Sequence, residues 1–142
     1  MLRYGQGVIL AGLGIVFWAA ALAWVRAIPM ALTDPAWNIL NFAGAVSVAW
    51  TCVLLIRRVA GLAPDQLMAG MGLVGAVAMT LDGAVLNWAP RMYGPDDTVT
   101  RLAAGWLLWG YGLSLAIALA MARAGRRRPS AATPSGDGVT PP

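Results

Sequence analysis

Residues 67–88 read LMAGMGLVGAVAMTLDGAVLNW, an apolar stretch in which Asp82 is the one charged side chain. A helix of about 20 mostly apolar residues spans the hydrocarbon core of a bilayer. Similar apolar stretches run over residues 7–25, 37–56 and 102–121. The sequence therefore predicts an all-α protein in which four transmembrane helices, joined by short loops, form an antiparallel bundle.

Composition limits what else the chain contains. It has 142 residues, of which 59% are hydrophobic and 11% charged, which is unlike a disordered or nucleic-acid-binding chain. We expect one transmembrane domain over residues 1–128. A disordered tail is expected over residues 129–142, where the composition changes to Pro, Ser, Gly and Thr. The net charge of +4 does not predict a nucleic-acid partner, because the arginines lie at span ends and form no face.

The arginines are divided unevenly between the two sides of the predicted bundle. One side carries Arg3, Arg57, Arg58, Arg123, Arg126, Arg127 and Arg128, and the other carries Arg26, Arg91 and Arg101. Cytoplasmic loops carry the excess of arginine, so both termini are predicted to be cytoplasmic. Every base is arginine and every acid aspartate, which suggests a G+C-rich bacterial genome and hence a multi-pass protein of the bacterial inner membrane.

Two features near the chain ends allow alternatives. The N-terminal segment resembles a signal peptide. A basic residue, Arg3, precedes the apolar run, and the small residues of Ala21-Leu22-Ala23 are typical of a cleavage site. Because the run continues to Arg26, a spanning length, we expect a retained helix. The cluster Arg126-Arg127-Arg128 is interpreted as an orientation signal, and alternatively as a binding site for anionic lipid headgroups.

The residue types that are missing exclude several kinds of chemistry. Without histidine there is no His-based metal site, haem ligand or Ser-His-Asp triad. Cys52 is the lone cysteine, so no intrachain disulfide forms, and we expect it to be a small buried apolar residue. The hydroxyls within the spans have no histidine or lysine as a base. The sequence predicts neither an enzyme nor a metal or cofactor site.

Small residues recur every four positions on two spans. Ala43, Ser47 and Thr51 form one line, and Gly72, Ala76 and Thr80 form another. Such lines let helix backbones approach closely in a membrane. They favour a compact bundle, and leave open a homo-oligomer or a place in a larger membrane complex.

Asp82 is the residue that a membrane span should not contain. It lies six residues before Trp88, about 9 Å along a helix. A central aspartate costs about 2.5–3.5 kcal/mol on insertion scales, so it is expected to face the bundle interior and to have a partner. The predicted polar site consists of Asp82, Asn41, Arg91, Arg101, Trp109 and Tyr111, with Arg26 and Trp106 as further neighbours.

The nature of the partner separates three interpretations of Asp82. Contact with Arg91 or Arg101 would make the carboxylate a structural link between the third helix and the loop that follows it. A carboxylate without a cation would be suited to carrying a proton or binding a substrate. A third interpretation puts Asp82 at an interface with another subunit.

Three segments of the third and fourth spans and their loop resemble a known family. They are Leu81-Asp82, Pro90-Arg91-Met92-Tyr93 and Trp106-Leu107-Leu108-Trp109-Gly110-Tyr111-Gly112. Together they are similar to a bacterial domain-of-unknown-function family of small four-helix integral membrane proteins. The resemblance implies the four-helix fold and a joint cluster of the aspartate, the Pro-x-x-Tyr loop and the Trp/Tyr stretch. It implies no mechanism, since that family has no assigned activity.

The sequence is most typical of a structural or accessory subunit of the membrane. The alternative is a small proton-coupled transporter that uses Asp82. Small multidrug exporters have a similar length and number of spans, but they depend on a glutamate in the first span, and this chain contains no glutamate.

Overall fold

The structure is a computed structural model that describes residues 1–126, the side chain of Arg126 excepted. The predicted tail and the cluster Arg126-Arg127-Arg128 therefore lie outside the described side chains. The elements, in chain order, are α1 (Tyr4–Ala27), α2 (Met30–Thr33), α3 (Pro35–Val59), α4 (Leu67–Trp88), η1 (Pro90–Met92) and α5 (Asp97–Arg126). Four of them, α1, α3, α4 and α5, are long and apolar enough to cross a membrane. The predicted all-α fold with four membrane-length helices is confirmed for the described residues.

Helices α3 and α5 begin earlier than the apolar stretches that they contain, because aspartates cap them. One carboxylate oxygen of Asp34 accepts hydrogen bonds from the backbone N–H groups of Ala36 and Trp37, each at 3.0 Å. A carboxylate oxygen of Asp96 accepts from the N–H of Val99 at 2.9 Å. Such caps satisfy the free N–H groups of a first helical turn.

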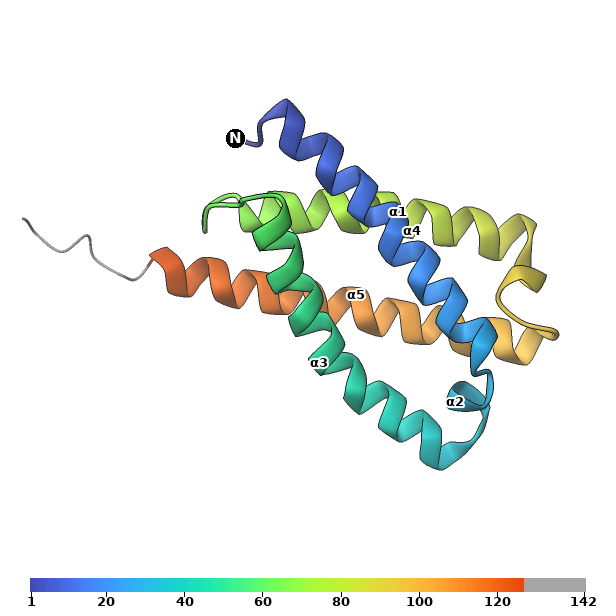
Figure 1. The fold of residues 1–142 in the computed structure, drawn as a ribbon. Coiled ribbons are helices and arrows are strands. Elements are labelled where there is room, and N and C mark those ends of the chain that lie inside the picture. Colours follow the sequence, from blue (N-terminus) through green and yellow to red (C-terminus); the bar gives the residue numbers. More distant parts are fainter. Residues whose placement is uncertain (127–142) are drawn as a thin grey trace, which may run out of the picture.

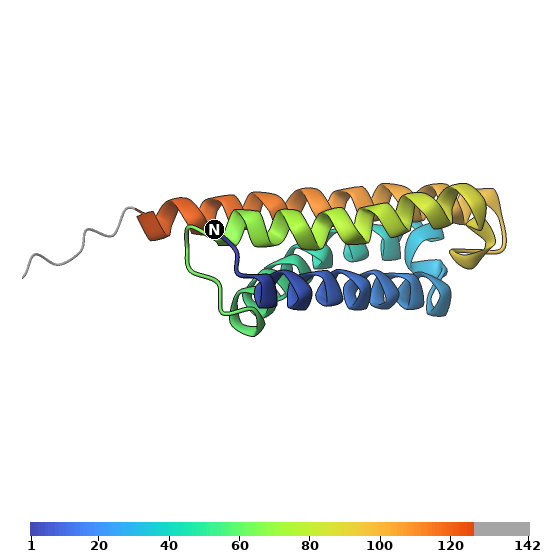
Figure 2. The same cartoon turned by 90° about the horizontal axis from the view of Figure 1, so that it is seen from above.

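The four long helices form two layers (Figures 1 and 2). Helices α4 and α5 lie side by side in one layer. In the other layer, α1 packs chiefly on α4 and α3 chiefly on α5, and both run obliquely across the first layer (Figure 1). Helices α1 and α3 have little contact with each other. The second layer is therefore split along its length.

Two apolar clusters stabilise the two ends of the molecule. One contains Leu10, Val53, Ile56 and Leu67, and the other contains Val25, Leu32, Tyr93 and Val99. Large apolar side chains are exposed on all four long helices, for example Val16, Ile39, Trp88 and Leu108. Exposed apolar surface of this extent suits contact with lipid.

The small-residue lines predicted to pack the bundle lie elsewhere than expected. Every residue of the line from Ala43 to Thr51 and of the line from Gly72 to Thr80 is exposed. Inside the fold, the close approach of α1 to α4 occurs at Gly14. A Cβ atom there would lie 2.9 Å from the backbone oxygen of Val74. The interpretation that these two lines hold the bundle together is therefore wrong.

The start of α1 is tied to the connection between α3 and α4. The Nε2 atom of Gln6 donates to the backbone oxygen of Ala60 at 3.1 Å and to that of Gly61 at 3.3 Å. Gly61 has a φ of 58°, which glycine adopts without the penalty that a Cβ atom brings. The side chain of Gln66 donates to the backbone oxygen of Met1 at 2.8 Å. These bonds hold the N-terminus against the turn that leads into α4.

Candidate functional site: Asp82, two tyrosines and an apolar cavity

Asp82 is buried near the C-terminal end of α4, six residues before Trp88. Only 4% of its surface is exposed, and it is the one buried charged residue among the described residues. Its helix α4 contacts both α1 and α5, so the carboxylate is enclosed by protein. In an apolar interior each carboxylate oxygen needs a hydrogen-bond donor.

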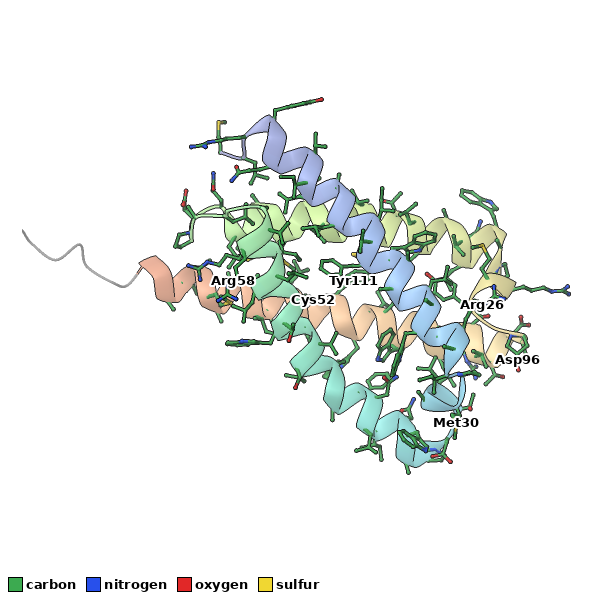
Figure 3. All side chains as sticks on the ribbon, in the orientation of Figure 1. Arg26, Met30, Cys52, Arg58, Asp96 and Tyr111 are labelled. Atoms are coloured by element: carbon green, nitrogen blue, oxygen red, sulfur yellow. The ribbon has the colours of Figure 1, made fainter. Side chains whose placement is uncertain are left out.

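Two tyrosine hydroxyls meet this need. Tyr93, from the turn after η1, donates to one carboxylate oxygen of Asp82. Tyr111, from the middle of α5, donates to the other oxygen at 2.5 Å. Figure 3 shows Tyr111 between the two ends of the molecule, which are marked by Arg26 and Asp96 on one side and Arg58 on the other. The carboxylate thus links α4, the turn after it and α5.

The chain brings Tyr93 back to α4 through a tight turn. Helix α4 ends at Trp88, and the three residues of η1 reverse the chain direction. The side chain of Val99 packs on this turn so closely that a Cβ atom at Gly94 would lie 2.5 Å from it. Tyr93 is fully buried in the cluster with Val25 and Val99.

The environment of Tyr93 favours its protonated form. Burial is the largest cause that raises the pKa of Tyr93, followed by its hydrogen bond to Asp82 and the negative charge of that residue. Trp18 on α1 lies close enough to lower this pKa somewhat. Its indole N–H is buried and has no hydrogen-bond partner within residues 1–126. Tyr93 therefore acts as a neutral donor to a carboxylate.

The predicted site residues are only partly brought together. Tyr111 contacts Asp82, as one of the predicted partners. Trp109 instead donates from Nε1 to the backbone oxygen of Phe42 at 3.1 Å, so it joins α5 to α3. Asn41 lies on a cavity wall, and its buried Nδ2 has no partner in the described part of the chain.

The arginines take no part in this cluster. Arg91 and Arg101 are exposed, and so is Arg26. The hydroxyls of Tyr93 and Tyr111 occupy the two carboxylate oxygens instead. The interpretation that Arg91 or Arg101 holds the carboxylate of Asp82 is therefore wrong. The hydroxyls of two tyrosines hold it instead.

Beside this cluster lies a cavity of about 560 Å³. All four long helices contribute residues to its wall. On α5 these are Trp106, Leu107, Gly110, Tyr111 and Ser114. Tyr111 thus belongs to the wall and also binds Asp82, whereas Asp82 itself does not line the cavity.

The wall is apolar apart from a few groups. Asn41 from α3 and Tyr111 and Ser114 from α5 are the lining residues with polar side chains, together with Cys52 and three tryptophans. The indole N–H of Trp106 is buried without a hydrogen-bond partner in the described residues. The volume of the cavity lies in the range of about 300–1,000 Å³ that small-molecule sites occupy.

No group of three or more His, Cys, Asp or Glu side chains in the described residues is arranged to hold a metal ion. Comparison with protein-family models, with curated proteins and with solved structures gives no match for this chain.

Proposed function

We propose that this protein is a non-catalytic accessory protein of the bacterial inner membrane, in which Asp82 is an internal structural link. The observation that carries the proposal is that both carboxylate oxygens of Asp82 are engaged by the hydroxyls of Tyr93 and Tyr111. A group that couples transport to protons has to exchange with water or substrate. Asp82 is 4% exposed and does not line the cavity, which favours the structural role.

The physical cost of Asp82 fits this role. A hydrogen bond to a charged group contributes about 1.5–3 kcal/mol, more than a neutral one. Two such bonds offset the cost of placing a carboxylate within a span. In return they fix the turn after α4, and with it the start of α5, against the side of α4.

The proposed topology has both termini in the cytoplasm. Arg58 and Arg26 lie at opposite ends of the molecule (Figure 3), and the end of Arg58 also holds the N-terminus (Figure 1). The arginine excess on that side supports a cytoplasmic location for it. Retention of the first helix is supported by Leu10, which is fully buried in the core formed with α3 and α4. The proposal includes membership of the domain-of-unknown-function family described above. It also includes the alternative role of the cluster Arg126-Arg127-Arg128, which is binding of anionic lipid headgroups.

The experiment compares the thermal stability in detergent of the parent protein with that of Tyr93→Phe, Tyr111→Phe and Asp82→Leu. Each tyrosine variant removes one donor to the carboxylate and is expected to lose about 1.5–3 kcal/mol of unfolding free energy. Asp82→Leu leaves two hydroxyls without an acceptor and is expected to be destabilised as well. Tyr4→Phe is the matched control, since Tyr4 is 90% exposed, and it should leave stability unchanged. Parent-like stability of Asp82→Leu would refute the structural role.

One observation favours a second candidate, a small proton-coupled transporter. Tyr111 both lines the cavity and binds Asp82, so rotation of this one side chain would connect the carboxylate with the cavity. The test is proton flux into liposomes that contain a pH-sensitive dye, measured for the parent and for Asp82→Asn. The accessory role predicts the same low flux for both proteins. Flux that depends on Asp82 would replace the accessory proposal by the transporter.

A further inference from the structure

Helices α1 and α4 run in the same direction and keep one register along their contact (Figure 1). A Cβ atom at Gly70 would lie 3.6 Å from the side chain of Leu10, and one at Gly14 would lie 2.9 Å from the backbone oxygen of Val74. Both contacts join residues that are 60 positions apart in the chain. Residues four positions apart lie on the same face of an α-helix, so this register carries the contact on towards the C-terminal ends of both helices.

Trp18 is the next residue of α1 on this face, one turn after Gly14. The register places Trp18 level with Ala78, which is one turn before Asp82 on α4. The long side chain of a tryptophan reaches across one such turn. The indole of Trp18 lies close enough to the hydroxyl of Tyr93 to lower the pKa of that tyrosine. Helix register and local chemistry therefore both put Trp18 beside the carboxylate cluster.

Trp18 and Tyr93 have complementary hydrogen-bonding needs. An indole N–H can only donate, and that of Trp18 is buried without a partner in the described part of the chain. The hydroxyl of Tyr93 gives its single proton to Asp82, so its oxygen keeps lone pairs that can accept. Tyr93 is fully buried, away from water. A bond from the indole to this oxygen would remove the free-energy cost of a buried N–H without an acceptor.

We propose that Trp18 is a positioning residue for the Asp82 cluster, and that a small rotation of its indole lets the N–H donate to the hydroxyl oxygen of Tyr93. A hydroxyl that accepts a hydrogen bond is polarised and becomes a stronger donor. Trp18 thereby strengthens the bond from Tyr93 to Asp82, and it joins α1 to a cluster that already links α4, the turn after it and α5. This inference rests on the proposed structural role of Asp82.

The test observes the indole N–H of Trp18 by NMR, in full-length protein that is labelled with ¹⁵N-tryptophan and held in detergent micelles. The signal of Trp18 is assigned by its loss in Trp18→Phe. Tyr93→Phe keeps the ring and removes the acceptor oxygen. The N–H proton of Trp18 is then expected to shift upfield, because a hydrogen bond deshields it. Tyr111→Phe is the matched control, since it removes the other donor to Asp82 and leaves the oxygen of Tyr93 in place, and the Trp18 signal should stay near its parent position.

The converse experiment observes the acceptor. The protein is labelled with ¹³C at the Cζ atoms of its three tyrosines, and Trp18→Phe removes the indole N–H. The Cζ signal of Tyr93 is expected to shift, because this atom carries the hydroxyl that loses a hydrogen bond. The signals of Tyr111 and of the exposed Tyr4 should stay in place. Tyr4→Phe and Tyr111→Phe assign the three signals by elimination, so this experiment does not depend on the folding of Tyr93→Phe.

Two results would overturn the proposal. A Trp18 signal that is unchanged in Tyr93→Phe would mean that the indole does not donate to this hydroxyl. Equal shifts in Tyr93→Phe and Tyr111→Phe would mean that Trp18 only responds to loosening of the cluster. If Tyr93→Phe fails to fold, an unchanged Cζ signal of Tyr93 in Trp18→Phe overturns the proposal by itself. Failure of the structural role of Asp82 is seen separately, as parent-like stability of Asp82→Leu, and does not depend on these shifts.

Discussion

Replacement of Gly14 by alanine tests how α1 is attached to the rest of the molecule. Gly14 is buried, and it faces the backbone of α4. A Cβ atom there would lie 2.9 Å from the backbone oxygen of Val74 and 3.0 Å from the Cβ atom of Val77. Because the first of these atoms belongs to a helical backbone, the new methyl group fits only if α1 moves away from α4.

The size of the effect follows from two opposing contributions. Overpacking of a tight contact costs about 1–3 kcal/mol. Alanine is favoured over glycine within a helix by about 1 kcal/mol. Gly12, two residues earlier on α1, has nothing within 4 Å of its Cβ position, so Gly12→Ala gains only the second contribution. The two variants are expected to differ by about 1–3 kcal/mol in unfolding free energy, with Gly14→Ala the less stable.

The assay is titration of the purified protein with a denaturing detergent in mixed micelles, followed by circular dichroism. Gly12→Ala should unfold at or above the detergent concentration of the parent, and Gly14→Ala should unfold below that of Gly12→Ala. Equal midpoints for the two variants would refute the reasoning. They are also the result expected if the first helix is cleaved from the mature protein.

Two further expectations concern topology and capping. Reporter fusions placed after Arg128 and within residues 90–98 should report opposite sides of the membrane, the first cytoplasmic, and the same side for both would contradict the four-span topology. Asp34→Ala should lower the unfolding free energy by about 0.5–2 kcal/mol, because Asp34 caps two N–H groups of α3. Asp34→Asn should keep most of the stability of the parent, because an asparagine side chain also caps helices. Equal thermal stability of the Asp34→Ala variant and the parent would show that the cap contributes nothing.

The sequence predicted the four helices because membrane spans depend on a local property, the mean apolar character of about 20 residues. It did not predict the two layers, since these depend on which helix faces pack. The small-residue line from Ala43 to Thr51 is exposed, whereas Gly14 provides the close contact. A repeat of small residues marks where a helix can approach another, but it does not identify the neighbour.

The surroundings of Asp82 were predicted in part for a similar reason. A buried carboxylate had to have donors, and Tyr111 was one of the candidates. Arg91 and Arg101 were candidates because they carry the opposite charge, yet both are exposed. Burial of a guanidinium costs much more desolvation free energy than burial of a neutral hydroxyl. The role of Tyr93 depends on the turn at η1, which only the Pro-x-x-Tyr segment hinted at.

The split between α1 and α3 has a consequence for the order of assembly. During synthesis α1 and α3 enter the bilayer before α4, and helices that insert singly associate afterwards. Because α1 packs chiefly on α4 and hardly on α3, the first two spans have no firm contact to make with each other. The first helix therefore stays surrounded by lipid until α4 is inserted. The tertiary packing of α1 depends on α4, which comes later in the chain. Lipid is therefore the first neighbour of α1.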